Sequence, residues 1–268
     1  MRSVVHANGL STWRFAFDGD DLLAAVTTRN GGVSTGPYAE LNLGFHVGDQ
    51  PERVAENRRR LCEALGVGTL TVGDQQHRDR VAIVDSALAG AGHNSAGDAT
   101  ARLGATDALV TALPGVALTV MVADCAPVVL YDPEHRAVGM AHVGRGGAVR
   151  DVLGVAIRTM STEFGSIPAQ LHAGVGPCID AGAYEIDGTA LEETRAAFAP
   201  ALFRPTRGGA AAFDLRSAVL ERLVEHGIRR DRVEVDARTT TDYRDELFSD
   251  RAERPCGRFM LVAALRPR

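Results

Sequence analysis

Short runs of apolar residues, separated by segments of turn-forming residues, recur along most of the chain. Apolar runs of roughly four to eight residues between turns are typical of buried strands. They predict strands at Leu22–Thr27, Val81–Val84, Ala108–Thr111, Ala117–Val122, Val128–Tyr131, Ala137–Ala141, Leu171–Gly174, Val233–Asp236 and Arg258–Leu265. Segments with helix start and stop signals predict helices at Pro51–Leu65, Arg150–Phe164, Thr189–Phe198 and Leu215–His226.

Strands and helices intermix throughout, which predicts the α/β fold class (mixed α+β), with a mixed β-sheet or sheets flanked by helices. We expect a single domain over residues 1–268, because no repeat is visible and the apolar content is steady. Two segments of small and polar residues, Ala87–Ala105 and Arg207–Ala212, are predicted surface loops. The longest uncharged stretch, Ala108–Ala123, is shorter than the roughly 20 residues of a membrane span. With no segment resembling a secretory signal, a cytoplasmic protein without membrane contact is expected.

The composition narrows the possible chemistry. All 29 basic residues are arginine, since the sequence contains no lysine. Schiff-base chemistry and pyridoxal-phosphate attachment need a lysine amine and are therefore excluded. The 34 acidic residues give a net charge of −5, so binding to nucleic acid is not expected. Any phosphate or carboxylate of a substrate must be bound by arginine, histidine, a metal or backbone amides.

One predicted hairpin brings a thiol and an imidazole together. An apolar run leads through Cys125 to a turn at Asp132–Arg136 and returns as Ala137–Ala141. If the turn is centred near Glu134, Cys125 lies opposite position 143, one residue from His142. Side chains that face each other on paired strands have Cβ atoms about 4.5–5.5 Å apart. The neighbouring Asp124 is expected to point to the other face of its strand.

Three interpretations are compatible with this pair. Cys125 and His142 are a buried thiol beside a hydrogen-bonded core histidine, a catalytic nucleophile with its base, or two ligands of a zinc site. Catalytic zinc uses three protein ligands and one open position. His77, at the edge of a loop, is the best local candidate for the third ligand. Three other histidines remain alternatives: His46, His93 and His172.

Two arginines beside glycines are candidate anion-binding residues. Arg29 lies in the segment Thr27–Ser34, where two glycines permit close backbone approach, and its planar guanidinium suits phosphate or carboxylate. Arg145 lies three residues after His142 in a similar glycine-rich context. A turn with a surface arginine is the alternative in both places. Asn42 is a further candidate substrate-binding residue, and the remaining arginines are expected at the surface.

Several sequence blocks together resemble a known family. In order along residues 27 to 260 they read TTRNGGVSTGPYAELNLGFHVGD, NRRRL, QQH, TDALVT, ALTVMVADCAPVVLYD, AHVGRGG, GPCIDAGAYEI and CGRF. This set resembles the YfiH-like family, also called multicopper polyphenol oxidase or laccase-like proteins. The version of AHVGRGG found here is similar to an actinobacterial branch of that family.

The resemblance implies a zinc site of His77, Cys125 and His142. It implies phosphorolysis of adenosine, inosine and methylthioadenosine to free base and ribose 1-phosphate, with adenosine deamination as a further activity. Nucleoside and phosphate are then the partners, and Cys125, His142 and Arg29 the catalytic residues. The laccase label implies copper, which we disfavour because multicopper sites need more His and Cys ligands than the family pattern supplies.

Other functions remain open. Some members of the family are linked to editing of peptidoglycan precursors, a metal-free hydrolase could use Cys125 with His142, and a catalytically silent homologue could retain the metal. The chain also departs from the family pattern. It has Arg78 after the first histidine and HVGRGG in place of HAGWRG. Near the C-terminus it has Thr239–Thr241 where the family often has Cys-Thr, and Ala252 after Arg251 where the family has a second arginine.

Overall fold

The computed structural model describes residues 1–267, whose strands form two six-stranded sheets and one small sheet. Sheet I consists, in spatial order, of β1 (Arg2–Val5), β2 (Ser11–Arg14), β3 (Leu22–Thr27), β15 (Phe259–Leu265), β7 (Ala117–Val122) and β4 (Leu70–Val72). Sheet II consists of β14 (Val233–Val235), β10 (His172–Val175), β8 (Ala126–Asp132), β9 (Ala137–Val143), β6 (Ala108–Thr111) and β5 (Val81–Ile83). The small sheet consists of β11 (Glu185–Ile186), β13 (Ala211–Phe213) and β12 (Phe203–Pro205).

Helices of several lengths connect these strands. The α-helices are α1 (Pro51–Leu65), α2 (Ala96–Arg102), α3 (Arg145–Val149), α4 (Val152–Phe164), α5 (Gly188–Ala197) and α6 (Leu215–Glu225). Short 3-10 helices are η1 (Gly36–Tyr38), η2 (Phe45–Val47), η3 (Pro168–Gln170), η4 (Ala181–Ala183), η5 (Pro200–Leu202), η6 (Arg207–Gly209) and η7 (Arg230–Arg232). The chain therefore has the mixed α/β fold that the sequence predicts.

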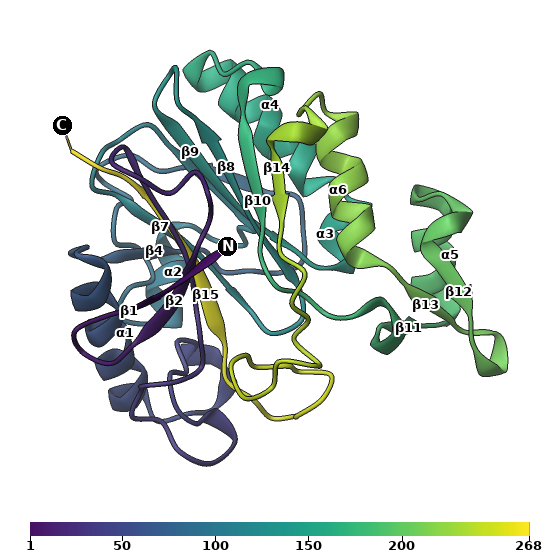
Figure 1. The fold of residues 1–268 in the computed structure, drawn as a ribbon, viewed down its shortest axis with the longest axis horizontal. Helices are drawn as coiled ribbons and strands as arrows, with labels where there is room; N and C mark the ends of the chain where they lie inside the picture. Colours follow the sequence, from purple (N-terminus) through teal and green to yellow (C-terminus); the bar gives the residue numbers. More distant parts are fainter. Residues whose placement is uncertain (268) are drawn as a thin grey trace.

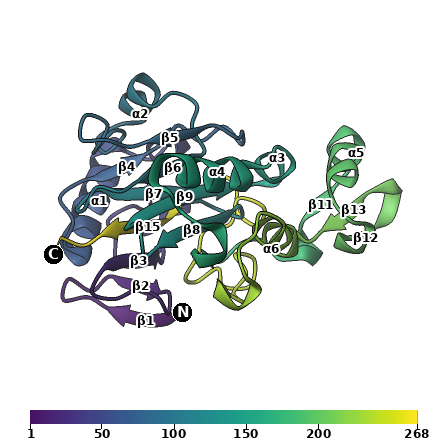
Figure 2. The same ribbon diagram turned by 90° about the horizontal axis from the view of Figure 1, so that it is seen from above.

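The two large sheets pack face to face, with helices on their outer faces (Figures 1 and 2). Val120 and Leu261 of sheet I share one buried cluster with Val129 and Met140 of sheet II. The next residues along each strand point the other way, because side chains alternate across a strand. They form two further clusters, one with α1 and one with α4 and α6. Both faces of each sheet are thus covered, which explains the continuous apolar runs.

The last strand lies at the centre of sheet I. β15 pairs in an antiparallel manner with β3 on one side and with β7 on the other. All seven of its residues are buried. Sheet I therefore joins the two ends of the sequence in one hydrogen-bonded layer.

Several predicted elements have the observed bounds, and others differ for local reasons. β3, β6, β7 and α1 begin and end as predicted. The helix predicted from Arg150 begins at Val152, because Asp151 adopts a left-handed conformation (φ 64°) and its side chain accepts a hydrogen bond from the Gly154 N–H. The other short elements were not predicted: β1, β2, β4, β11, β12 and α3.

The two predicted loops contain regular structure. α2 lies within Ala87–Ala105; its sequence has no apolar stripe, but Ser95 caps it by accepting the Asp98 N–H at 3.1 Å. β13 begins within Arg207–Ala212, because Ala211 and Ala212 pair with the strands on both sides. Short polar segments of this kind form structure through caps and strand pairing, which a hydrophobic pattern does not reveal.

The hairpin of β8 and β9 has a register one residue from the predicted one. Val143 pairs with Ala126, and His142 pairs with Pro127. Cys125 lies just before β8 rather than opposite position 143. The small sheet and α5 project to one side of the two large sheets in both views (Figures 1 and 2). Among the described residues, no helix is both long and apolar enough to span a membrane.

The packed interface between the two large sheets predicts a sharp difference between two leucines. Leu261 is fully buried there, whereas Leu113 is 39% exposed. Leu261→Ala should lower the free energy of unfolding by about 2–5 kcal/mol, because it removes apolar contacts and leaves a cavity. Leu113→Ala, the matched control, should change it by about 0.5 kcal/mol or less. Equal effects in denaturant unfolding would contradict this assignment of the core.

Candidate metal centre and its cavity

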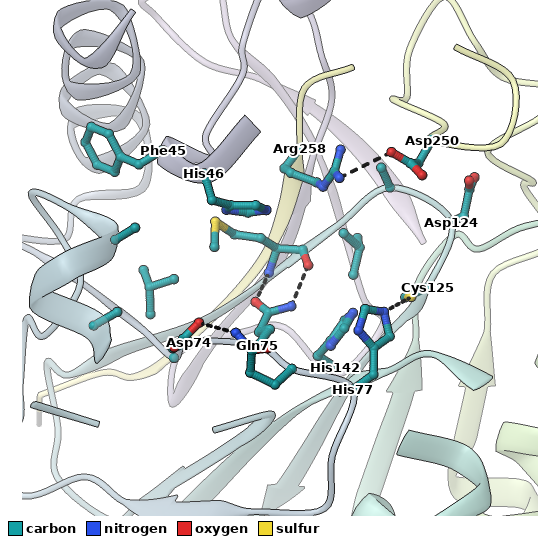
Figure 3. Close-up of a pocket in the computed structure, with 18 of the residues that line it drawn as sticks. Phe45, His46, Asp74, Gln75, His77, Asp124, Cys125, His142, Asp250 and Arg258 are labelled. Atoms are coloured by element: carbon teal, nitrogen blue, oxygen red, sulfur yellow. Dashed lines mark hydrogen bonds and ion pairs between the residues drawn. The ribbon is translucent and has the colours of Figure 1, made fainter. Parts of the chain in front are cut away.

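Three potential metal ligands meet where the chain crosses from sheet I to sheet II. His77 lies in the connection between β4 and β5, Cys125 between β7 and β8, and His142 in β9. One ligand atom from each lies within 4.8 Å of the others, and His77 Nε2 is 3.5 Å from Cys125 Sγ (Figure 3). The two imidazole rings meet edge to face, with centroids 4.8 Å apart. The structure therefore brings together the three residues named as a metal site.

The carboxylate of Asp107 organises two of the ligands. It accepts backbone N–H groups from Gln76, His77 and Arg78 at 2.8–3.1 Å, which fixes the loop that carries His77. Its Oδ1 also lies 2.9 Å from Nδ1 of His142. Burial raises the pKa of Asp107, but hydrogen bonds from His142 and the backbone N–H groups hold it below its ordinary value. An ionised Asp107 therefore accepts the Nδ1–H of His142 and leaves Nε2 of that ring for a metal.

The backbone around the ligands adopts conformations that few residues tolerate. His77 has a left-handed conformation (φ 55°), and Asp124 has φ 94°. Such conformations are uncommon outside glycine and persist where surrounding contacts enforce them, often at functional sites. At His77 the enforcing contacts are those of Asp107. This segment is therefore held in an unfavourable conformation by the same acid that orients His142.

Asp124 forms a bend rather than part of a strand, so the predicted alternation with Cys125 does not apply. Its carboxylate accepts hydrogen bonds from Thr240 Oγ1 (2.5 Å), Ser249 Oγ (2.7 Å) and the Arg251 N–H (2.6 Å). It also lines the cavity beside Cys125. The position of the thiol therefore depends on a segment more than one hundred residues further along the chain.

Gly144 allows the ligands to approach one another. A Cβ atom at this position would lie 2.5 Å from Cδ2 of His77 and 2.7 Å from Sγ of Cys125. Both distances are too short for any side chain. Gly144, two residues after His142, is thus required by the packing of the site.

Electrostatic interactions couple the thiol and the imidazole. Burial raises the pKa of Cys125, but the charge of His142 and hydrogen bonds from His142 and His77 lower it below its ordinary value. Burial lowers the pKa of His142, but the Cys125 thiolate and Asp107 raise it above its ordinary value. The site thus favours the thiolate, which is the form that binds metals.

This ligand set fits one zinc ion. Two imidazole nitrogens and one thiolate are ligands that zinc accepts, and three protein ligands leave a fourth position for water or substrate. Among the described residues, this is one group of three ligands, whereas multicopper sites need more histidine and cysteine ligands. The number of ligands therefore fits one metal ion and not a multicopper centre.

The three ligands open into a cavity of about 570 Å³, which is within the usual size of small-molecule sites. Apolar residues and the backbone of β7 form one wall, including Val72, Met121 and Val122. Gln75 is fixed in that wall, since its amide forms hydrogen bonds of 2.7 and 2.8 Å with the backbone of Met121 (Figure 3). Charged and polar residues line the rest: His46, Arg58, Asp74, Gln76, Asp124, Asp250, Arg251, Arg254 and Arg258.

Several of these lining residues are not among the site residues expected from the sequence. His46 was considered only as an alternative ligand, and Arg58 was expected at the surface, yet Arg58 is 2% exposed. Arg251, Arg254 and Arg258 also reach the cavity. The blocks FHVGD, NRRRL and CGRF that carry the resemblance contain His46, Arg58 and Arg258, and this was the available signal.

The structure places Arg29 outside this cavity. Its guanidinium donates to the carbonyl oxygens of Ala39 and Arg244, both at 2.9 Å, and pairs with Glu253 at 3.2 Å. It also stacks over Phe248, 4.4 Å from the ring centroid. Arg29 lines a separate open depression with Thr241, Asp242, Arg244, Asp245 and Glu253.

The other two candidate binding residues also have internal partners and do not line the cavity. Asn42 is fully buried, and its carbonyl oxygen accepts the N–H groups of Gly44 (3.0 Å) and Arg258 (2.9 Å). It thereby fixes the backbone of Arg258 and the backbone next to Phe45, both of which line the cavity. Arg145 pairs with Glu193 at 3.0 Å and connects α3 to α5.

The residues at which the chain departs from the family pattern form hydrogen bonds within the protein. The backbone of Arg78 donates to Asp107 at 2.8 Å, a contact that does not depend on its side chain. Thr240 donates to Asp124 in the segment without the cysteine. Arg251 donates to the carbonyl oxygens of Ala183 and Glu185, at the base of the projecting small sheet.

Comparison with known proteins identifies extensive similarity. A family model described as "Multi-copper polyphenol oxidoreductase laccase" matches residues 23–266. A protein of Corynebacterium glutamicum named purine nucleoside phosphorylase is 37% identical over 234 residues, covering 87% of this chain and 89% of that protein. One of Streptomyces coelicolor with the same name is 39% identical over 237 residues, covering 87% and 90%. The crystal structure of a hypothetical protein YfiH from Bacillus licheniformis superposes with a TM-score of 0.87 at 31% identity, covering 91% of this chain and 93% of that one.

Removal of the charge on Asp107 should weaken metal binding. Asp107→Asn retains the size of the side chain but weakens its hydrogen bonds to the His77 loop and to His142. We expect the affinity for zinc, measured by competition with a chelator, to fall about 10–100-fold. Asp20→Asn, at an exposed position, is the control and should bind zinc like the unmodified protein. Unchanged affinity in Asp107→Asn would show that this acid does not organise the site.

A single methyl group at Gly144 should separate the ligands. In Gly144→Ala the new Cβ clashes with His77 and Cys125, so zinc content by elemental analysis should fall well below that of the unmodified protein. Gly68→Ala is the matched control, since a Cβ at Gly68 meets nothing within 4 Å. Circular dichroism should remain unchanged in both variants. Full zinc content in Gly144→Ala would contradict this explanation of the glycine.

Proposed function

The chain belongs to the family described as multi-copper polyphenol oxidoreductase laccase, the YfiH family, and on that premise we propose that it is a zinc-dependent purine nucleoside phosphorylase. The observation that carries the proposal is a set of three zinc ligands at the wall of a 570 Å³ cavity. The names of the relatives in Corynebacterium glutamicum and Streptomyces coelicolor supply the reaction. Their sequences align with 87% of the chain.

We expect His77, Cys125 and His142 to hold the zinc ion, which when bound supplies a Lewis acid with one position open to substrate. Asp107 keeps the Nδ1 proton of His142 and so directs Nε2 of that ring into the site. Asp124 holds the bend that carries the thiol. These residues act by fixing the ligands before substrate arrives, which avoids the cost of reorganising them during the reaction.

The walls of the cavity suit a nucleoside. Val122, Ile179 and Tyr184 offer apolar surface for the flat face of a base, and Gln76 offers hydrogen-bonding groups at its edge. Ligand sites typically combine mostly apolar walls with a few polar groups that fix orientation. Adenosine, inosine and methylthioadenosine are the substrates we propose, with phosphate as the second reactant and free base and ribose 1-phosphate as products.

Copper oxidation of phenols has less support from the residues present. The described residues offer a single group of three ligands, and a multicopper oxidase needs further histidines and cysteines around additional ions. Deamination of adenosine at the same site would require a carboxylate to move a proton, and Asp124 is the acid adjacent to the ligands in the sequence. We treat deamination as an additional activity that the same assay detects.

The decisive assay incubates the zinc-loaded protein with adenosine or inosine, with and without inorganic phosphate, and identifies products by chromatography. We expect free base and ribose 1-phosphate only when phosphate is present; inosine formed from adenosine would indicate deamination. Cys125→Ala should contain little zinc and lose at least about 10²-fold in kcat/KM, because one of three ligands is removed. An unmodified, zinc-loaded protein that forms none of these products would refute the proposal.

Two controls separate the other possible functions. Cys178→Ala removes a buried thiol that is no part of the ligand set, and it should retain zinc and activity. Protein stripped of zinc that remains active and is labelled at Cys125 by a thiol reagent would indicate a cysteine hydrolase instead. Protein that retains zinc but converts no nucleoside would indicate a catalytically silent homologue or another substrate, such as a peptidoglycan precursor.

A further inference from the structure

The end of the cavity formed by η2, α1 and the start of β15 concentrates positive charge. Resting on the proposed phosphorolysis, we propose that inorganic phosphate binds there, between Arg58, His46 and Arg258, and that Asp250 pairs with Arg258 until phosphate replaces it. The relatives' names state the reaction but assign no residue to phosphate. The sequence singled out Arg29 for this role, and the structure places Arg29 elsewhere.

Arg58 is a buried cation without a carboxylate partner among the described residues. Its side chain is 2% exposed, and it donates to the carbonyl oxygens of Leu43 (2.9 Å), Gly92 (2.6 Å) and His93 (2.8 Å). These partners bind Nε and Nη1 and carry no net charge, whereas Nη2 makes only a 3.5 Å contact with Sδ of Met121. Burial lowers the pKa of Arg58 to about 9, which reflects the cost of the unbalanced charge. Because Arg58 lines the cavity, an anion bound there would provide the missing negative charge.

Arg258 provides a second guanidinium with one end available. Its Nη1 donates to the carbonyl oxygens of Cys256 and Gly257, at 3.1 and 3.0 Å, which fixes its direction. Its Nη2 makes only a long contact of 3.4 Å with Asp250 (Figure 3). Asp250 also pairs with Arg254, so its charge is already balanced without Arg258. A phosphate oxygen could therefore replace Asp250 at Nη2 without leaving that acid unpaired.

His46 lies beside Arg258 in the lining of the cavity (Figure 3). Burial and the charges of Arg258 and Arg58 lower the pKa of His46 to about 4, in spite of the opposing effect of Asp74. The ring is consequently neutral at physiological pH and can donate one hydrogen bond to an anion. Both arginines and this ring line the same cavity.

The location suits the reaction. The arginine end and the metal ligands line the same cavity, so a nucleoside bound between them would meet phosphate on one side of its sugar. A phosphate oxygen forms a bond to C1′ of the ribose while the bond from C1′ to the base nitrogen breaks. The electron pair of that bond goes to the base nitrogen, which finally receives the proton of hydrogen phosphate. The products are ribose 1-phosphate and the free base, with no other reactant required.

Two substitutions should change phosphate binding in opposite directions. Arg258→Gln removes a charged donor, and we expect the KM for phosphate to rise about tenfold or more while the KM for inosine and the zinc content stay within about twofold. Asp250→Asn removes the competing carboxylate, and the KM for phosphate should fall. Arg59→Gln is the matched control, because Arg59 adjoins Arg58 in the sequence but is exposed on α1. It should leave both KM values unchanged.

Direct binding distinguishes this proposal from the proposed function. Inorganic phosphate is titrated into zinc-loaded protein, with and without inosine, and the heat is measured for the unmodified chain, Arg258→Gln and His46→Gln. Phosphate affinity reduced about tenfold in both variants supports the subsite even if no nucleoside is cleaved, in which case only the proposed reaction fails. Active protein whose phosphate KM and affinity are the same in all three overturns the subsite alone. Undetectable phosphate binding in the unmodified chain, or a rise in phosphate KM in Arg29→Gln instead, also overturns it.

Discussion

The contact on which the site depends is the carboxylate of Asp107. It lies at the start of β6, and β6 pairs with β9 so that Ala108 faces Ala141. This register places His142 beside Asp107, where the backbone carbonyl of the acid accepts the His142 N–H at 2.8 Å and its side chain meets Nδ1. The carboxylate oxygens of Asp107 also accept the backbone N–H groups of the loop that carries His77. The pairing of β6 with β9 thus fixes the positions of both histidines through one buried acid. An apolar residue at this position could not accept the N–H groups of the His77 loop or the Nδ1–H of His142.

Charge is divided between the two ends of the cavity. The metal end holds a thiolate and an ionised acid, and the other end holds arginines, one of them without an acidic partner. Water is displaced from such a cavity when a ligand enters, which strengthens the interactions of both ends with it. The arrangement therefore suits a substrate that brings separate groups to each end. It also explains how a chain without lysine can bind an anion. Carbonyl oxygens and aromatic stacking hold the guanidinium groups in place, whereas lysine ammonium groups would be more flexible.

The pattern of apolar residues predicted the buried strands because both faces of each large sheet are covered, as at β7 and β15. It missed β4 and α2, whose few residues are held by neighbours rather than by a periodic pattern. The predicted hairpin correctly placed Cys125 near His142 although its register was wrong by one residue. In either register the two residues lie close together at the same end of the hairpin. The assignment of His77 as the third ligand depended on the resemblance to a family. The sequence near His77 does not show that it lies close to Cys125 and His142, because Asp107, thirty residues away, fixes its position. The prediction for Arg29 rests on a local glycine pattern, whereas the burial of Arg58 depends on carbonyl groups distant in the sequence, and its only sequence signal is its place in the block NRRRL.

The position of β15 has a consequence for synthesis of the chain on the ribosome. Sheet I consists of two parts, β1–β3 and β7 with β4, that share no hydrogen bonds until β15 enters between them. The residues that hold Asp124, and with it the thiol, lie in the segment that precedes β15. The central layer therefore cannot form before β15 has left the exit tunnel. The nascent polypeptide exposes the edges of β3 and β7 until β15 pairs with them, a period in which molecular chaperones would protect it from aggregation.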